Sequence, residues 1–287
     1  MMKKTTRASA LVLIFTFLFL KGLAQKETYP FEIKITGKGT KSLIFIPGFG
    51  CSGQVWDGIR PAYEGDFTCY TLTMAGFAGV PAKDSPSFKS WEKAIAGYIR
   101  QQKIIQPILV GHSMGGGLAM AIAADYPELV SAIVVVDALP CLQALMNPSF
   151  KAKENNDCAT SVYQLTAMSN EQFLQMQKTG LTRLLEDTSK LSLVASWAVA
   201  SDRSTFGEMY CDFSNTDLRE KVRTVICPAL ILLEAYFVNL NPIIAAQFKN
   251  LKTANIQYAT KGLHFIMYDD KEWLRKQMDN FLNGKKG

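Results

Sequence analysis

Residues 107–117, PILVGHSMGGG, hold the pattern on which the interpretation of the whole chain depends. A short apolar run leads into Gly111-His112-Ser113-Met114-Gly115, and a segment rich in Gly and Ala follows. The run predicts a buried strand, and the Gly/Ala-rich segment predicts a helix that packs closely against it. Glycines two positions before and after Ser113 indicate a turn too tight for a Cβ atom at either place. Such a turn lifts the Ser113 hydroxyl clear of the strand, where it is able to act as a nucleophile.

Outward from this motif, strands and helices alternate along the chain. Apolar runs predict strands at 42–46, 67–74, 107–110, 132–136, 229–233 and 255–259. Apolar periodicity predicts helices at 90–101, at about 115–125 and from about Asp270 onwards. This alternation is typical of an α/β fold with a doubly wound, mostly parallel sheet.

Residues 31–39 hold an alternating apolar pattern followed by a glycine-rich turn. Phe31, Ile33 and Ile35 alternate with polar residues, as in a strand with one buried face. Gly37-Lys38-Gly39 follows, directly before the strand at 42–46. The pattern predicts a hairpin that joins these two strands.

The pattern changes between about residues 138 and 222, where helical segments occur without a convincing strand. One helix is expected to start at Ser169-Asn170-Glu171-Gln172, a capping-box sequence. We therefore expect one domain over residues 25–287, with a helical cap inserted at about 138–222. Large apolar side chains of the insertion are available to pack the cap itself or to line a site over Ser113. They are Met146, Phe150, Tyr163, Leu165, Met168, Phe173, Met176 and Trp197.

The motif GHSMGG, its position and the order of elements resemble the α/β-hydrolase fold superfamily, in the form that carries a cap after the sixth strand. The resemblance extends from about Phe31 to Leu282. Esterases, thioesterases, lipases and related hydrolases share the motif, so it is specific for the fold and uninformative about the substrate. The resemblance implies a serine nucleophile, a histidine base and an acid in that family's arrangement.

A serine nucleophile needs a base, and the chain contains two histidines. His112 adjoins Ser113 in the turn, so its side chain is expected to point away from the nucleophile and to serve packing. His264 lies just after the last predicted strand, where the resemblance implies the catalytic histidine. We therefore assign the base to His264.

Residues 46–50, IPGFG, follow the first central strand. The resemblance implies an oxyanion hole here, formed by the backbone N–H groups of Phe49 and Met114. Pro47 stands where the family usually has a histidine, but that histidine is not the proton shuttle, so the chemistry should survive. A phosphate-binding loop is the alternative for a glycine-rich turn, but the Lys-Ser/Thr ending of a P-loop is missing.

The position of the catalytic acid departs from the pattern that the resemblance implies. In most relatives it lies a few residues beyond the strand after the cap, and Phe237 occupies about that place here. Asp137 ends the strand before the cap, keeps the order Ser, Asp, His, and is the acid we favour. Glu234, at the end of the strand after the cap, is the alternative. A dyad without a strong acid is the third arrangement.

Residues 1–24 predict a signal peptide. Lys3, Lys4 and Arg7 precede an apolar stretch at 8–20, and small residues follow up to Ala24. A membrane anchor is the alternative, but a spanning helix needs about 20 apolar residues and this stretch is shorter. We expect a periplasmic or secreted protein, cleaved near Ala24 and without a stable membrane anchor afterwards.

Six cysteines suit an exported protein, although their pairing cannot be deduced from spacing. Cys69 and Cys227 lie in or beside predicted strands and are expected to be buried and unpaired. Cys51 and Cys141 are expected near the rim of the site. No CxxC or zinc-like spacing occurs, and two histidines disfavour metal catalysis, so we expect no metal and no cofactor.

Charge and composition narrow the class of function. The formal charge is +6, and without residues 1–24, which hold four basic and no acidic side chains, it is +2. This excess is too small to predict nucleic-acid binding. We expect a serine hydrolase that cleaves a small or medium apolar carboxylic ester through an acyl-enzyme. Thioester or amide hydrolysis, and a catalytically silent binding protein on the same fold, are the alternatives.

Overall fold

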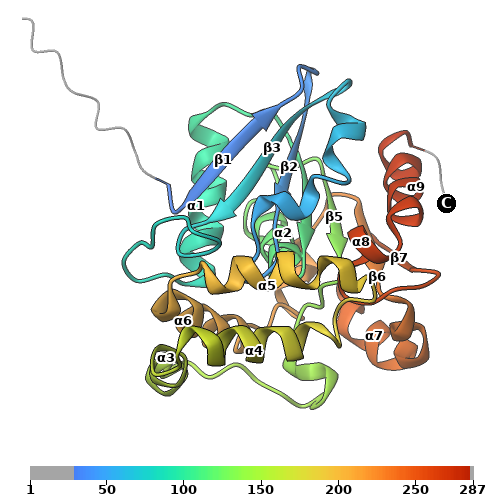
Figure 1. Ribbon diagram of the computed structural model, residues 1–287. Coiled ribbons are helices and arrows are strands. Elements are labelled where there is room, and N and C mark those ends of the chain that lie inside the picture. Colours follow the sequence, from blue (N-terminus) through green and yellow to red (C-terminus); the bar gives the residue numbers. More distant parts are fainter. Residues whose placement is uncertain (1–28, 285–287) are drawn as a thin grey trace, which may run out of the picture.

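The computed structural model describes residues 29–284, which form a seven-stranded sheet with helices on both faces (Figure 1). The strand order is β1-β3-β2-β4-β5-β6-β7. Neighbouring strands are parallel except β1, which is antiparallel to β3. The predicted doubly wound, mostly parallel sheet is confirmed. Its strands are β1 (Phe31–Thr36), β2 (Lys41–Ile46), β3 (Phe67–Met74), β4 (Ile108–His112), β5 (Ala132–Val136), β6 (Ala229–Leu233) and β7 (Ala254–Tyr258).

The predicted hairpin between β1 and β2 is wrong. β1 pairs with β3, and β3 lies between β1 and β2. The glycines do turn the chain, but they do so over the start of β3. An ideal Cβ on Gly37 would lie 2.2 Å from the carbonyl oxygen of Phe67, and one on Gly39 would lie 1.9 Å from that of Asp66. A glycine turn reverses the chain without choosing its partner strand, and here β3 fills the place between the two.

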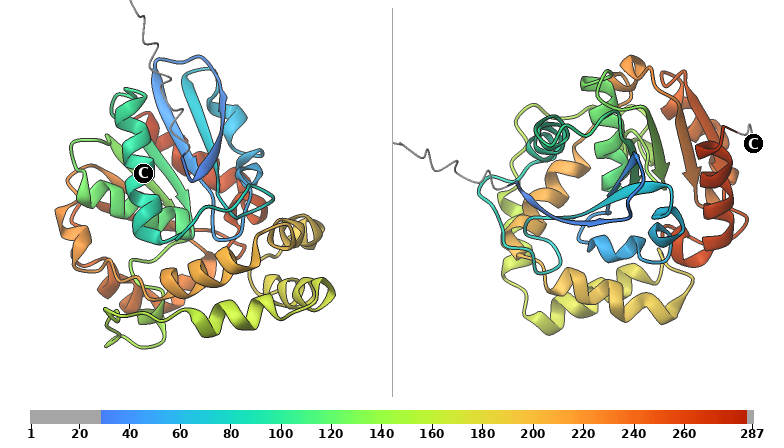
Figure 2. Two further views of the ribbon diagram at one scale, coloured as in Figure 1. Left: turned by 90° about the vertical axis from the view of Figure 1, so that its left-hand side faces the viewer. Right: turned by 90° about the horizontal axis from the view of Figure 1, so that it is seen from above.

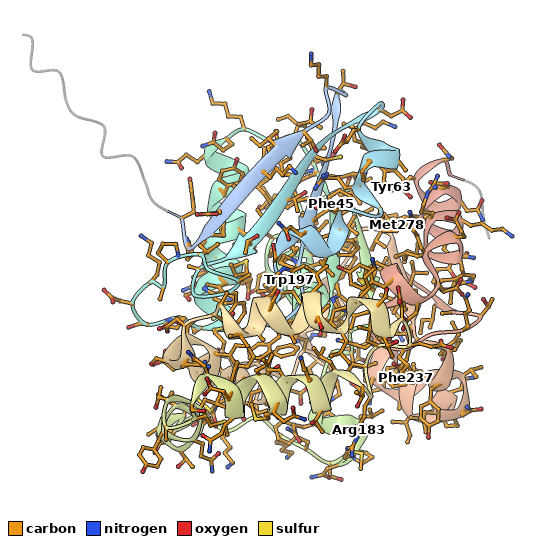
Figure 3. The ribbon with its side chains drawn as sticks, in the orientation of Figure 1. Phe45, Tyr63, Arg183, Trp197, Phe237 and Met278 are labelled. Carbon is orange, nitrogen blue, oxygen red and sulfur yellow. A yellow bond between two sulfur atoms is a disulfide. The ribbon has the colours of Figure 1, made fainter. Side chains whose placement is uncertain are left out.

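Alternating side chains on the central strands build two separate cores. Ile44 and Ile46 of β2 belong to one core, and Leu43 and Phe45 belong to the other. Figure 2 shows helices on both sides of the sheet, and Figure 3 labels Phe45 and Met278 of the second core. The first core is covered by α1 (Phe88–Gln101), α2 (Met114–Asp125) and α7 (Asn241–Phe248). The second is covered by η1 (Gly53–Trp56), η2 (Arg60–Tyr63), α8 (Ile266–Asp269) and α9 (Lys271–Leu282).

The chain between β5 and β6 forms a helical layer at one edge of the sheet, and we call residues 138–222 the cap (Figure 1). Residues 137–228, all of them described, contain no strand. The predicted capping box is present at the start of α4, because Ser169 Oγ accepts the N–H of Gln172 and the Gln172 side chain accepts that of Ser169. The cap helices are α3 (Ala159–Thr166), α4 (Asn170–Leu181), α5 (Leu191–Val199) and α6 (Arg203–Ser214). Shorter 3-10 helices are η3 (Gln143–Leu145), η4 (Thr188–Lys190) and η5 (Lys221–Thr224), and η6 (Ala235–Leu240) follows β6.

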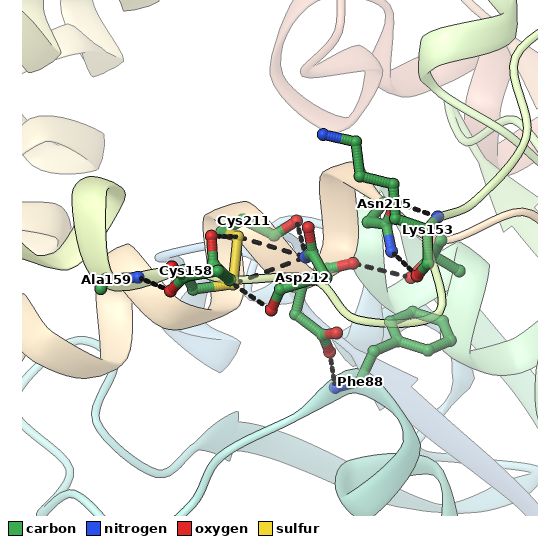
Figure 4. The surroundings of a disulfide bond; sticks show 10 residues. Phe88, Lys153, Cys158, Ala159, Cys211, Asp212 and Asn215 are labelled. Carbon is green, nitrogen blue, oxygen red and sulfur yellow. Dashed lines mark hydrogen bonds between the residues drawn. A yellow bond between two sulfur atoms is a disulfide. The ribbon is translucent and has the colours of Figure 1, made fainter.

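A disulfide joins two helices of the cap. Cys158, directly before α3, is bonded to Cys211 of α6 across a sequence separation of 53 (Figure 4). The next residue of α6, Asp212, accepts the backbone N–H of Phe88 at 2.7 Å (Figure 4). Because Phe88 begins α1, this bond also ties the cross-linked pair to the core of the domain.

The other four cysteines, Cys51, Cys69, Cys141 and Cys227, are free. Cys69 and Cys227 are buried and unpaired, as predicted. Within residues 29–284 none of the helices has the length and apolar character needed to cross a membrane. Residues 1–24, for which the sequence predicts a signal peptide, lie outside the described residues.

We expect Gly111→Ala to lower the free energy of unfolding by about 1–3 kcal/mol, as overpacking does. The reason is steric, because an ideal Cβ on Gly111 would lie 2.2 Å from the carbonyl oxygen of Gly115. Gly97→Ala, on α1, is the matched control, since a Cβ there would have nothing within 4 Å. It should leave stability equal or slightly higher, because Ala favours helix. Thermal unfolding followed by circular dichroism checks both, and equal Tm values would contradict the close approach.

Candidate active site

Ser113 lies on the turn between β4 and α2, with φ 53° and ψ −122°. A non-glycine residue in this region is strained and persists only where its surroundings hold it. Here the N–H of Ser113 donates to the carbonyl of Val136 on β5 at 2.9 Å. The side chain is half-buried and lines a cavity at the carboxyl edge of the sheet. The turn has the conformation that the sequence predicts for a nucleophile elbow.

Neighbouring parallel strands end beside this turn because their register is aligned. His112 pairs with Val136, and Val136 pairs with Leu232. The first residues beyond β5 and β6, Asp137 and Glu234, therefore reach the same edge as Ser113. Strand ends of this kind are where α/β sheets place their ligands and reactive groups.

Asp137 and His264 form a short hydrogen bond within the cavity wall. Nδ1 of His264 lies 2.6 Å from Oδ2 of Asp137. The other oxygen, Oδ1, accepts the backbone N–H of Glu234 at 2.7 Å. The Asp137 side chain is 2% exposed and that of His264 is 21% exposed. The carboxylate selects the tautomer with a proton on Nδ1, which leaves Nε2 as the nitrogen able to accept a proton.

Glu234, the other acid considered, plays a different part. Its backbone N–H holds Asp137, and its side chain lines the cavity. Burial, with a smaller contribution from Asp137, raises the pKa of Glu234 to about 7. Phe237, at the place where the family usually carries its acid, is part of the same cavity wall. Of the two candidate acids, Asp137 is the one hydrogen-bonded to His264.

His112 packs against the histidine that the sequence singled out. The two ring centroids are 4.6 Å apart, and Nε2 of His112 donates to the carbonyl oxygen of His264 at 3.0 Å. Burial, and then the nearby His264, hold the pKa of His112 well below its ordinary value, so this ring is neutral. The sequence predicted a packing role for His112, and its hydrogen bond to the carbonyl oxygen of His264 fixes the orientation of the ring.

The loop after β2 lies directly on the elbow. An ideal Cβ on Gly115 would lie 2.4 Å from the carbonyl oxygen of Ile46, and one on Gly48 would lie 3.1 Å from the Cβ of Ser113. Phe49, in the same loop, lines the cavity. Met114 is the first residue of α2, so its N–H lies at the helix end, where the helix's own carbonyls cannot accept it. The two residues predicted to supply an oxyanion hole thus flank one turn.

A cavity of about 440 Å³ opens over Ser113, between the sheet edge and the cap. Its cap wall is mostly apolar and includes Leu142, Leu145, Leu181, Leu184, Val194 and Phe206. The eight cap residues named from the sequence, all of them described, are absent from the lining, so the expectation that a fraction of them lines the site is wrong. Their other expected use, packing within the protein, holds for Phe173. Phe173 is buried edge-on against Phe206, whereas Met146 is 87% exposed. Apolar character alone did not reveal which face of each cap helix meets the sheet.

The two cysteines expected near the cavity are both buried and unpaired. Cys51 lines the cavity, but burial raises the pKa of its thiol to about 12. Cys141 is buried, with its N–H donating to Gln247 Oε1, and lies outside the lining, so of the two cysteines expected near the rim only Cys51 contacts the cavity. Within residues 29–284 no group of three or more His, Cys, Asp or Glu side chains is placed to bind a metal ion.

The raised pKa of Glu234 should make stability depend on pH. The native protein keeps this proton up to about pH 7. An unfolded chain releases it near the ordinary glutamate pKa of about 4.3. Between these values the native state binds more protons, so it loses stability as the pH rises. Glu234→Gln has no proton to release. We expect its Tm relative to wild type to be higher at pH 8 than at pH 5, as measured by calorimetry. An equal Tm difference at both pH values would contradict this.

Comparisons with known proteins show the family and the fold of this chain. A family model described as alpha/beta hydrolase fold matches residues 41–234. A pimeloyl-[acyl-carrier protein] methyl ester esterase of Proteus mirabilis (strain HI4320) is 26% identical over 251 residues, covering 85% of this chain and 94% of that protein. Among solved structures, the enol-lactonase from Burkholderia xenovorans LB400 has a TM-score of 0.70 at 15% identity, over 88% of this chain and 96% of that one. A thermophilic esterase from Thermogutta terrifontis has a TM-score of 0.74 at 14% identity, over 88% and 93% of the two chains. At such identities the structural likeness shows a shared fold.

Proposed function

This chain belongs to the alpha/beta hydrolase fold family, and from that premise we propose that it is a serine hydrolase of carboxylic esters. One observation carries the proposal: Ser113 on its strained turn shares a cavity with His264, whose Nδ1 is held at 2.6 Å by a buried carboxylate. The curated relative named as a methyl ester esterase supports the same class of bond.

In the proposed reaction the Ser113 hydroxyl attacks the ester carbonyl while Nε2 of His264 takes its proton. Asp137 stabilises the imidazolium that forms, because its buried carboxylate already accepts the Nδ1–H. The backbone N–H groups of Phe49 and Met114 bind the oxyanion. His264 then returns its proton to the departing alkoxide, which leaves an acyl-enzyme. A water molecule, deprotonated by the same imidazole, then attacks the acyl carbon; the bond to Ser113 Oγ breaks, and His264 returns the proton to Oγ as the acid leaves.

The cavity favours a substrate of modest size and low polarity. Its volume of about 440 Å³ is in the lower part of the range for small-molecule sites. Leucines of the cap and Phe206 are part of its lining. We therefore propose an ester with a small or medium apolar acyl or alcohol group.

Active-site variants test the proposal directly. Wild-type protein should react with a fluorophosphonate probe and hydrolyse p-nitrophenyl esters of short or medium chain, whereas Ser113→Ala and His264→Ala should do neither. Asp137→Asn should lower kcat by a factor on the order of 10⁴ with KM little changed, because the tautomer is lost but the cavity remains. Glu234→Gln, the matched control, should cost far less, since its side chain has no hydrogen bond to His264. If Glu234→Gln is inactive and Asp137→Asn is not, the acid is misassigned.

We propose further that the protein is exported and loses residues 1–24. The charge and apolar pattern of that segment supports this, and so does the Cys158–Cys211 disulfide, because disulfides persist in oxidising compartments. N-terminal sequencing of the mature protein should begin just after Ala24, and recovery of Met1 would contradict export with cleavage.

Cys158→Ser should lower the free energy of unfolding by about 2–4 kcal/mol.

A further inference from the structure

Asp269, at the end of α8, is a buried carboxylate that the proposed reaction does not use. It is 9% exposed, and the ion pairs found within residues 29–284 do not include it. A charge removed from water is costly unless hydrogen bonds replace its hydration. Its partners are backbone N–H groups, and their origin is informative.

These N–H groups come from two distant segments. Leu263, the residue before His264, donates to Oδ2 at 2.9 Å. Glu186 and Asp187, in the connection between α4 and α5, donate to Oδ1 at 3.1 and 2.8 Å. One carboxylate therefore joins the loop that carries His264 to the cap, and we call this contact the junction.

The surrounding backbone reinforces this junction. Gly262 has φ +85°, and a Cβ on it would lie 2.4 Å from the Cβ of Asp269, so the loop passes directly over the carboxylate. On the other side of His264, the N–H of Phe265 donates to the carbonyl of Leu184 at 3.2 Å. Leu184 is itself part of the cavity wall. Both neighbours of His264 are thus held, directly or through Asp269, by residues 184–187.

We propose that Asp269 is a positioning residue for His264. It joins the loop of His264 to the α4–α5 connection of the cap, so the position of the imidazole relative to Ser113 depends on the position of the cap. The inference rests on the proposed function, because the position of His264 matters for turnover only if that residue is the base. A carboxylate accepts N–H groups from both sides at once. An asparagine at 269 has one accepting oxygen, and its NH₂ group must face an N–H on the other side.

Two neighbouring acids provide matched controls. Glu186→Gln removes an exposed carboxylate from the same junction and leaves the Glu186 N–H in place. Asp270→Asn affects the loop but not the cap, because the carboxylate of Asp270 accepts from the N–H and hydroxyl of Thr260.

For Asp269→Asn, we expect kcat on p-nitrophenyl acetate to fall by about 10- to 100-fold, the effect of a displaced catalytic group. KM should stay within about twofold, because Asp269 itself is not part of the cavity lining. Glu186→Gln should match wild type in both constants. Hydrogen exchange read by mass spectrometry should rise together in residues 260–265 and 184–190 of Asp269→Asn, and only in 260–265 of Asp270→Asn.

A purely structural role would lower Tm while leaving kcat unchanged well below Tm, and that outcome overturns the proposal. If Asp269→Asn does not fold, the wild-type protein still tests the junction, since the amides of Leu263 and Asp187 should both be strongly protected. Rapid exchange of either amide overturns it. Failure of the wild type to react with the fluorophosphonate probe identifies a failure of the proposed function instead, and the positioning role then falls with it.

Discussion

The hydrogen bond between His264 and Asp137 is the interaction on which the rest of the site depends. It places a nearly inaccessible carboxylate against an imidazole that is 21% exposed, so the ring has one nitrogen committed and one available. The chain accepts an unfavourable φ of 48° at Asp137 to bring this about. The N–H of Glu234 donates to the second oxygen, which fixes the orientation of the carboxylate.

The same bond shows how the proposed acid, Asp137, can follow β5 although the resemblance implies an acid beyond β6. β5 and β6 are neighbours and end in register, so the residues that follow either strand lie at the same edge of the sheet. With Asp137 in that role, the position after β6 is free to carry Phe237, which becomes part of an apolar wall. The backbone N–H of Glu234 then holds the carboxylate of Asp137, although Glu234 was the alternative candidate for the acid.

Local patterns predicted much of this structure and failed where long-range packing decides. The elbow around Ser113, the strand segments and the capping box at Ser169 are set by nearby residues, and all are present. The partner of β1 and the lining faces of the cap helices depend on docking between distant segments, and both were mispredicted. Asp269 left no trace in the sequence, because its partners are backbone N–H groups, one of them 83 residues away.

The disulfide has a consequence for how this chain can vary. Cys158 and Cys211 close residues 158–211 into a covalent ring that contains most of the cap, and Asp212 fastens the ring's exit to α1. Because the two ends of the ring are bonded to each other, residues gained or lost inside it leave the distance between its attachment points unchanged. The roof of the cavity outside residues 184–187 can therefore be remodelled as a module, by natural divergence or by loop grafting, while the sheet beneath keeps its dimensions.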